Sequence, residues 1–133
     1  MTVCYIFDSY ALLALLEDEP GADLVTELIS DRKTEAYISA INLGEIYYLL
    51  LRRSGVNQAE RVLESITLED SISIAEASWE RVKEASKVKA DGGLSFADAF
   101  AVALAKELEA PLVTGDPEII EKAEANNIQV IAI

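Results

Sequence analysis

Val3-Cys4-Tyr5-Ile6-Phe7-Asp8 is a short, continuous run of apolar and aromatic residues that stops at an aspartate. A run of this length and composition favours a strand buried inside a sheet. The apolar segment that follows it, up to Leu16, indicates a helix that ends before Pro20 and Gly21. A buried strand that leads directly into a helix is the repeating unit of a parallel sheet, because parallel neighbours need a crossover connection.

The same alternation continues along the chain. We expect further strands at residues 36–39, 72–75, 111–114 and 128–133, and further helices at 22–30, 40–53, 58–66, 79–90, 95–109 and 117–125. Strands separated by helices imply a parallel sheet with helices on both faces, so the predicted fold class is α/β. At 133 residues, 51% of them hydrophobic, the sequence is expected to form a single domain over residues 1–133.

The composition restricts the chemistry. No histidine is present, which excludes Ser-His-Asp and Cys-His triads, histidine metal sites and histidine acid/base pairs. The 24 acidic and 11 basic residues give a net charge of −13, which disfavours broad electrostatic binding to nucleic acid. Any catalysis must therefore rest on carboxylates, and any binding of RNA needs a local explanation.

Membrane and secretory signals are not found in the sequence. The richest apolar run, residues 11–16, ends at Glu17 and is far shorter than the roughly 18 residues that span a bilayer. The first residues show no basic region ahead of an apolar one, so we expect a cytoplasmic protein without membrane association. The single cysteine, Cys4, cannot form an intrachain disulfide and is interpreted as a small apolar residue.

Four carboxylates stand out by their positions. Asp8 and Asp116 each follow an expected strand, and ligands of open parallel sheets bind at the carboxyl ends of strands. Glu45 and Asp98 each interrupt a helical row of mainly apolar residues three and four positions away. Helix capping is an alternative role for the two strand-end aspartates, and Ser95 with Asp98 has the spacing of a capping box. A cap and a ligand role are compatible.

Buried carboxylates without a partner cost several kcal/mol or take up a proton. No cation near any of the four acids in the sequence pairs obviously with it. A hard divalent ion, Mg²⁺ or Mn²⁺, prefers oxygen ligands and would compensate several carboxylates at once. The four acids as a set therefore indicate a metal site, with one ion or two.

These motifs, taken in order, resemble the PIN-domain family, and within it the VapC-like toxins of bacterial and archaeal toxin–antitoxin pairs. The resemblance covers nearly the whole chain and rests on Asp8-Ser9 after a strand, Ser39-Ala40-Ile41-Asn42-Leu43-Gly44-Glu45 and Leu94-Ser95-Phe96-Ala97-Asp98-Ala99 opening helices, and Thr114-Gly115-Asp116-Pro117 after a strand.

The resemblance implies a five-stranded parallel sheet of order 3-2-1-4-5 flanked by helices, and a metal-dependent endoribonuclease that uses Mg²⁺ or Mn²⁺. It also implies a homodimer and a cognate antitoxin that blocks the site. By the family pattern, the catalytic and metal-binding acids are Asp8, Glu45, Asp98 and Asp116. Ser9, Asn42 and Thr114 stand where the family often has polar groups that orient a carboxylate or a water, although capping and turn formation explain them equally well.

RNA would need a local basic rim, for which the candidates are Arg52, Arg53, Lys87 and Lys89; a solvated helix face is the alternative reading of the lysines. The sequence disfavours two other functions. A receiver-like signalling domain would need paired acids after the first strand and an acceptor aspartate after the third, but Ile74 is followed by Ala75-Glu76. A non-catalytic PIN-like scaffold is disfavoured because all four acids are present.

Overall fold

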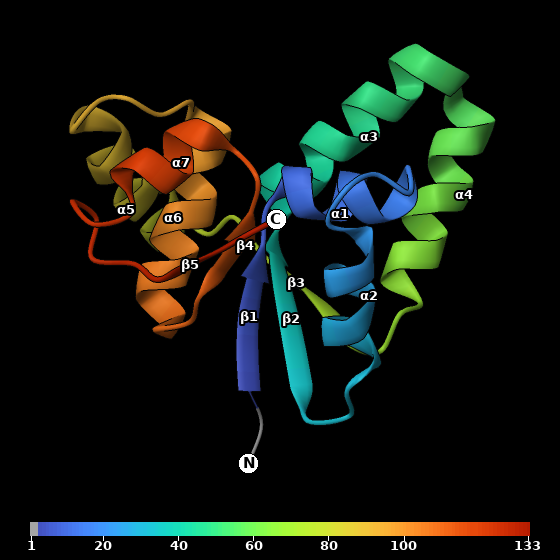
Figure 1. Ribbon diagram of the computed structural model, residues 1–133. Helices are drawn as coiled ribbons and strands as arrows, with labels where there is room; N and C mark the ends of the chain where they lie inside the picture. The colour runs from blue at the N-terminus through green and yellow to red at the C-terminus, as the bar shows by residue number, and fades with distance from the viewer. Residues whose placement is uncertain (1–2) are drawn as a thin grey trace.

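The computed structural model describes residues 3–133 (Figure 1). Strands and helices alternate along most of the chain. In order, the elements are β1 (Val3–Phe7), α1 (Ser9–Leu16), α2 (Ala22–Ser30), β2 (Thr34–Ser39), α3 (Ala40–Ser54), α4 (Val56–Thr67), β3 (Ile72–Ala75), α5 (Trp79–Ala90), α6 (Phe96–Leu108), β4 (Leu112–Thr114), α7 (Pro117–Lys122) and β5 (Val130–Ala132).

The five strands form one sheet of order β3-β2-β1-β4-β5, in which every pair is parallel. The predicted fold class and strand order are therefore confirmed. The central strand β1 pairs with β4 at Ile6↔Leu112 and Phe7↔Val113. This register brings Asp8, which follows β1, and Thr114, the last residue of β4, to the same edge of the sheet.

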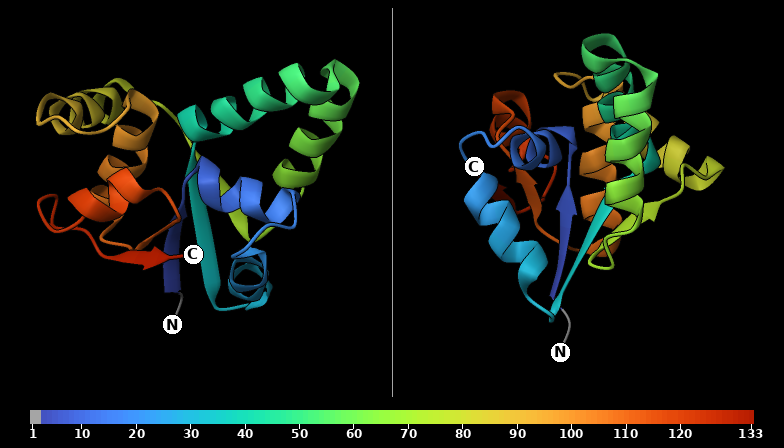
Figure 2. Two further views of the ribbon diagram at one scale, coloured as in Figure 1. Left: turned by 45° about the horizontal axis from the view of Figure 1, so that its top comes forward. Right: turned by 90° about the vertical axis from the view of Figure 1, so that its right-hand side faces the viewer.

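Adjacent residues of the central strands face opposite sides of the sheet. Ile6 and Leu112 belong to an apolar core beneath α5, α6 and α7, whereas Phe7 and Val113 belong to a second core beneath α1 to α4. The two groups of helices lie on either side of the sheet in Figure 1 and in the left view of Figure 2. All four residues are fully buried, which is why the strand sequences are apolar without alternation.

Several elements have bounds that differ from the sequence prediction, among them β2, α4, α7 and β5. β2 begins at Thr34 because its pairing with β1 extends to Val3↔Thr34. α7 ends at Lys122, whose carbonyl accepts hydrogen bonds from the backbone and side-chain amides of Asn126. β5 is confined to the three residues that pair with β4.

Within residues 3–133 no helix combines the length and the apolar character needed to cross a bilayer.

Candidate active site

Asp8 is held in place from two sides. Its Oδ1 accepts a hydrogen bond of 2.9 Å from the Ala11 amide and so caps the N-terminus of α1. Its Oδ2 accepts a hydrogen bond from the Thr114 hydroxyl at the end of β4. The side chain is only 2% exposed. The capping role and the position at the sheet edge therefore apply to the same carboxylate.

Thr114 connects Asp8 to the loop that carries Asp116. Its Oγ1 donates to Asp8 and accepts a hydrogen bond of 3.0 Å from the Asp116 amide. Asp116 in turn caps α7, because its Oδ1 accepts from the Glu118 amide at 2.9 Å. The fully buried hydroxyl of Thr114 thus fixes the positions of both aspartates.

Asp98 comes from the first turn of α6. Ser95 caps this helix, and its Oγ accepts a hydrogen bond of 3.1 Å from the Asp98 amide. The buried Asn42 of α3 donates from Nδ2 to the carbonyl oxygen of Ala97 at 3.1 Å, which ties the start of α6 to α3. The cap engages the backbone of Asp98 and leaves its carboxylate available.

Glu45 is linked to the edge of the sheet through Ser9. The Ser9 hydroxyl donates to Oε1 of Glu45, which is partly buried on α3. Because Ser9 follows Asp8 directly, this bond brings α3 and its carboxylate toward the start of α1. Ser9 therefore donates a hydrogen bond to the Glu45 carboxylate, as Thr114 does to that of Asp8.

Three carboxylates from two helices converge beside Asp8. Asp98, Asp116 and Glu118 each place one oxygen so that all three lie within 4.8 Å of one another. Asp98 comes from α6, whereas Asp116 and Glu118 belong to the start of α7. Oxygens at this spacing can share one cation.

The electrostatics of the site disfavour free negative charge. Burial raises the pKa of Asp8 from its ordinary value of 3.8 to about 6, and the negative charge of Asp116 adds to this effect. Burial likewise raises the pKa of Asp98 to about 7, again with Asp116 as the next cause. Hydrogen bonds from Thr114 and Ala11 to Asp8, and from Ser95 to Asp98, partly oppose the increases.

The residues present fit a divalent cation. Three ion pairs form within residues 3–133, and none of them includes Asp8, Asp98 or Asp116. The ligands on offer are carboxylate oxygens, which suit Mg²⁺ or Mn²⁺. A positive charge here would offset the burial and the repulsion between carboxylates that together raise the pKa values of Asp8 and Asp98. Asp98, Asp116 and Glu118 would hold it, with Asp8 beside them.

Thr114→Val tests this arrangement, because valine keeps the shape and removes the hydroxyl. We expect unfolding to become easier by about 1 to 3 kcal/mol, since a buried amide loses its acceptor and Asp8 its donor. Affinity for Mn²⁺ should fall by about 10- to 100-fold, the usual loss when a group that orients a ligand is removed. Urea denaturation and Mn²⁺ titration would measure both. Thr114→Ser is the matched control and should stay close to the parent; equal losses in both variants would contradict the hydroxyl's role.

Comparison with known families adds independent evidence. The family model described as PIN domain matches residues 5–125, a span that contains every acid described above. The chain belongs to the PIN-domain family. A comparison with curated proteins gave no significant match.

Solved structures similar to this PIN domain include proteins of toxin–antitoxin systems. VapC20 of Mycobacterium tuberculosis, a toxin that cleaves the sarcin-ricin loop, has a TM-score of 0.69 and 19% identity over 88% of this chain and 93% of that one. VapBC2 of Rickettsia felis, bound to promoter DNA, has a TM-score of 0.74 and 15% identity over 98% of this chain and 99% of that one. A protein from Pyrobaculum aerophilum has a TM-score of 0.67 and 27% identity over 92% and 86%.

The structure groups the predicted residues unevenly. The charge of Asp116 contributes to the raised pKa of both Asp8 and Asp98. Glu45 is not in the group whose oxygens lie within 4.8 Å, and it is linked to the site through Ser9. Asn42 contacts the backbone of α6, and its Oδ1 has no partner within residues 3–133. Glu118 was missed, because a glutamate in the first turn of a helix is an ordinary complement to the helix dipole.

The four candidate RNA-binding residues of this PIN domain all have intramolecular partners. Arg52 donates to the Tyr48 hydroxyl at 3.1 Å, and Arg53 pairs with Glu17. Lys87 pairs with Glu84 at 3.0 Å, and Lys89 donates to the Leu94 carbonyl at 2.8 Å. Such exposed contacts are weak and can be exchanged for a phosphate, so binding of RNA by these residues stays a prediction.

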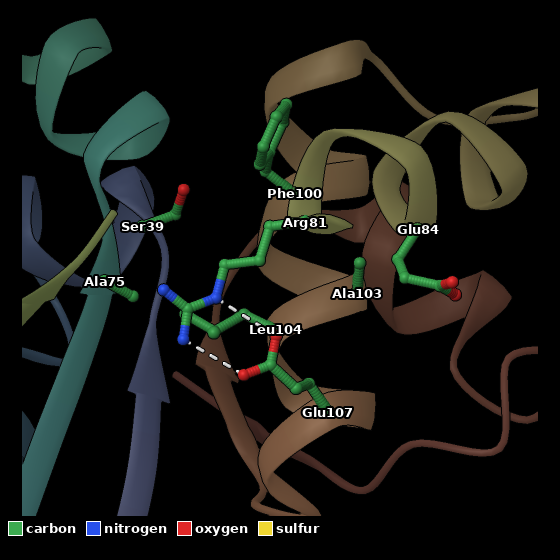
Figure 3. A pocket seen from close by; sticks show the side chains of 8 residues that line it. All are labelled: Ser39, Ala75, Arg81, Glu84, Phe100, Ala103, Leu104 and Glu107. Atoms are coloured by element: carbon green, nitrogen blue, oxygen red, sulfur yellow. Dashed lines mark hydrogen bonds and ion pairs between the residues drawn. The ribbon is translucent and has the colours of Figure 1, made fainter. Parts of the chain in front are cut away.

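A separate cavity lies between α5, α6 and the end of β2. It is lined by Ser39 and Ala75 and by Arg81, which makes two 3.0 Å hydrogen bonds to Glu107 (Figure 3). Its volume is about 10 Å³, which is close to the minimum for a single water. We therefore assign this cavity and its ion pair to packing between helices, and place the candidate active site at the acidic edge of the sheet.

Proposed function

We propose that this protein is a divalent-metal-dependent endoribonuclease and the toxin of a toxin–antitoxin pair. The observation that carries the proposal is the convergence of Asp98, Asp116 and Glu118 within 4.8 Å, beside the buried Asp8 and without a compensating cation among residues 3–133. In the folded protein, burial and neighbouring negative charges make the ionised forms of Asp8 and Asp98 unfavourable. A bound metal ion would compensate these charges, which explains why such an unfavourable arrangement persists.

The chain's own residues would prepare the site in three ways. Thr114 orients Asp8 and Asp116, Ser95 fixes the start of α6, and Ser9 directs Glu45. When bound, a divalent ion supplies a lowered pKa for the attacking water and stabilises charge on the leaving oxygen. Because the sequence has no histidine, the proton of that water must pass to a carboxylate or to solvent.

The net charge of −13 is compatible with an RNA substrate if attraction is local. A bound cation offsets the negative charge at the acids themselves, and Arg52, Arg53, Lys87 and Lys89 are the candidate contacts for flanking phosphates. With so few contacts, binding of RNA should be weak, and its dependence on salt should be shallow because each phosphate contact adds only about 0.7 to 0.9 to the slope. The acidic surface also suits a partner that brings basic side chains to the site.

The proposed partners are a cognate antitoxin and a second copy of this chain. The antitoxin is supported by the similar solved structures, among them a toxin–antitoxin complex from Klebsiella pneumoniae. Apolar side chains at the end of α3 and the start of α4 lie exposed, with Tyr48 at 52% and Val56 at 56%, and supply surface for either partner. Light scattering of the protein alone and with its antitoxin would determine both assemblies.

RNA cleavage with and without metal tests the proposed activity directly. The purified protein, freed of antitoxin, should cleave RNA in Mg²⁺ or Mn²⁺ and stop in excess EDTA, because the site offers only oxygen ligands and no metal-free catalytic set. Activity should return when metal is restored. An Asp98→Asn sample purified in parallel controls for contaminating nucleases. Cleavage that continues undiminished in EDTA, beyond the level of that control, would refute metal dependence.

A further inference from the structure

Tyr10 is an exposed aromatic residue beside the acidic site. It is in the first turn of α1, two residues after Asp8 and one after Ser9, which holds Glu45. The side chain is 43% exposed. An aromatic ring that is left partly in water forgoes the gain it would obtain from burial, so its position beside the acids calls for an explanation.

The ring is positioned by a close approach to Gly115. A Cβ built on Gly115 would lie 2.5 Å from Cζ of Tyr10 and 2.9 Å from its Oη, closer than a side chain permits. Gly115 does not have a left-handed φ, so a side chain there would be opposed by the ring and not by the backbone conformation, and it would have to displace the ring. Because Gly115 connects Thr114 to Asp116, the ring packs directly on the loop that carries the acids.

The other exposed aromatic rings have partners of their own. Tyr48 lies under the Arg52 guanidinium and Trp79 under the Lys83 ammonium, each at 5.9 Å from the ring centroid. Phe96 packs against Phe100 at 5.4 Å. Within residues 3–133, Tyr10 is the exposed aromatic residue whose ring has neither a cation nor a second ring against it.

We propose that Tyr10 is a stacking platform for an unpaired nucleobase next to the phosphodiester that is cut, and so selects single-stranded RNA. This inference rests on the proposed ribonuclease function and specifies the substrate class of the same site. A base has an aromatic face that matches an exposed tyrosine ring, and such stacking tolerates any base. In a duplex the bases are already stacked and paired, so the ring gains nothing from it.

Binding of a fluorescent oligonucleotide would test the platform apart from cleavage. The probe is a single-stranded oligoribonucleotide that carries one 2-aminopurine. It is titrated at low salt in EDTA and also in Mg²⁺ before cleavage begins, and stacking on tyrosine quenches its fluorescence. Tyr10→Leu keeps apolar packing on Gly115 and removes the aromatic face. We expect its Kd to rise by about 5- to 150-fold, the factor for one lost base–aromatic stack, with loss of quenching. Tyr10→Phe should behave like the parent.

Matched controls separate the ring from general effects. Trp79→Leu removes an exposed aromatic ring on α5, on the opposite face of the sheet from α1 (Figure 1), and should leave the Kd unchanged. Circular dichroism melts would confirm that each variant folds. Duplex RNA of the same sequence should bind with equal affinity to the parent and to Tyr10→Leu.

The outcomes distinguish this inference from the proposed function. In cleavage assays Tyr10→Leu should raise KM by a similar factor and change kcat little for a single strand. If the parent cleaves RNA but Tyr10→Leu keeps both its KM and the quenching, the platform is refuted and the nuclease stands. If the parent quenches the probe through Tyr10 but cuts no RNA, the binding role stands and the nuclease is refuted. A parent that neither binds nor quenches the probe would overturn the platform.

Discussion

Asp98→Asn should lower metal-dependent RNA cleavage by at least about 100-fold, because it removes a ligand where loss of a merely orienting group already costs 10- to 100-fold. The Asp98 carboxylate is one of the three whose oxygens lie within 4.8 Å. The Ser95 hydroxyl accepts a hydrogen bond from the backbone amide of Asp98, which the substitution retains, so the helix start should survive. Initial rates with saturating Mn²⁺ would measure the loss, and the thermal melt in EDTA should show no destabilisation.

Asp91→Asn is the matched control for this change. Asp91 is an exposed acid in the turn between α5 and α6, so the substitution removes the same charge close by in the sequence. Its cleavage rate should stay within about twofold of the parent, because Asp91 is outside the group of Asp98, Asp116 and Glu118 and an exposed charge is largely screened by solvent and salt. Equal activity in Asp98→Asn and Asp91→Asn would exclude Asp98 from the site.

Asp8→Asn should change stability and function in opposite directions. The pKa of Asp8 is raised to about 6, so its charged form destabilises the folded state at neutral pH. Asparagine removes the charge and still caps α1 through its side-chain oxygen. The Thr114 hydroxyl loses its charged acceptor, which costs about 1 kcal/mol. Cleavage should nevertheless be lost, and metal should bind more weakly, because the carboxylate beside the three ligands is removed.

The pH dependence follows from the raised pKa. Below the ordinary value of 3.8, Asp8 is protonated in both states and contributes nothing. As the pH rises from about 4 to about 6, the unfolded chain releases its proton and the folded protein retains it, so the parent loses stability across that window. The loss is about 3 kcal/mol for a shift of this size. After the cost at Thr114 is subtracted, Asp8→Asn should be more stable by about 1 to 2 kcal/mol at pH 8.

Thermal melts at two pH values would test this prediction. In EDTA at pH 8 the melting temperature of Asp8→Asn should exceed that of the parent by roughly 4 to 8 °C, and near pH 4 the advantage should vanish. Added Mn²⁺ should raise the parent's melting temperature by mass action and have little effect on the variant. If Asp8→Asn melts at a lower temperature than the parent at pH 8, and Mn²⁺ still raises its melting temperature as much as the parent's, Asp8 serves only as a helix cap.

Much of the fold is predictable because apolar runs and breaks mark each element. Leu112–Thr114 is a buried strand and Val3–Phe7 is buried at its carboxyl end, and both sequences are mainly apolar. Periodicity alone does not tell which strands are neighbours. The order β3-β2-β1-β4-β5 was expected from the family resemblance, and it is this order that brings Asp8 and Asp116 together.

The parts that could not be predicted depend on contacts between distant residues. The Thr114 to Asp8 hydrogen bond joins residues 106 positions apart, and no local pattern marks it. The contact of Tyr10 with Gly115 is equally distant, and the glycine reads as an ordinary turn residue. Glu118 joins the acidic cluster only because α7 begins at the sheet edge. The end of α7 depends on capping by Asn126, which periodicity does not reveal.

Binding of Mn²⁺ measured by electron paramagnetic resonance is the most direct test of the metal site. Free Mn²⁺ gives a sharp spectrum that weakens on binding, so titration of the antitoxin-free protein reports affinity without any substrate. The proposed site predicts saturable binding at pH 8, much weaker binding at pH 5.5, where Asp98 and Asp8 hold protons, and loss of binding in Asp98→Asn. Binding that is equally tight in the parent and in Asp98→Asn would contradict it.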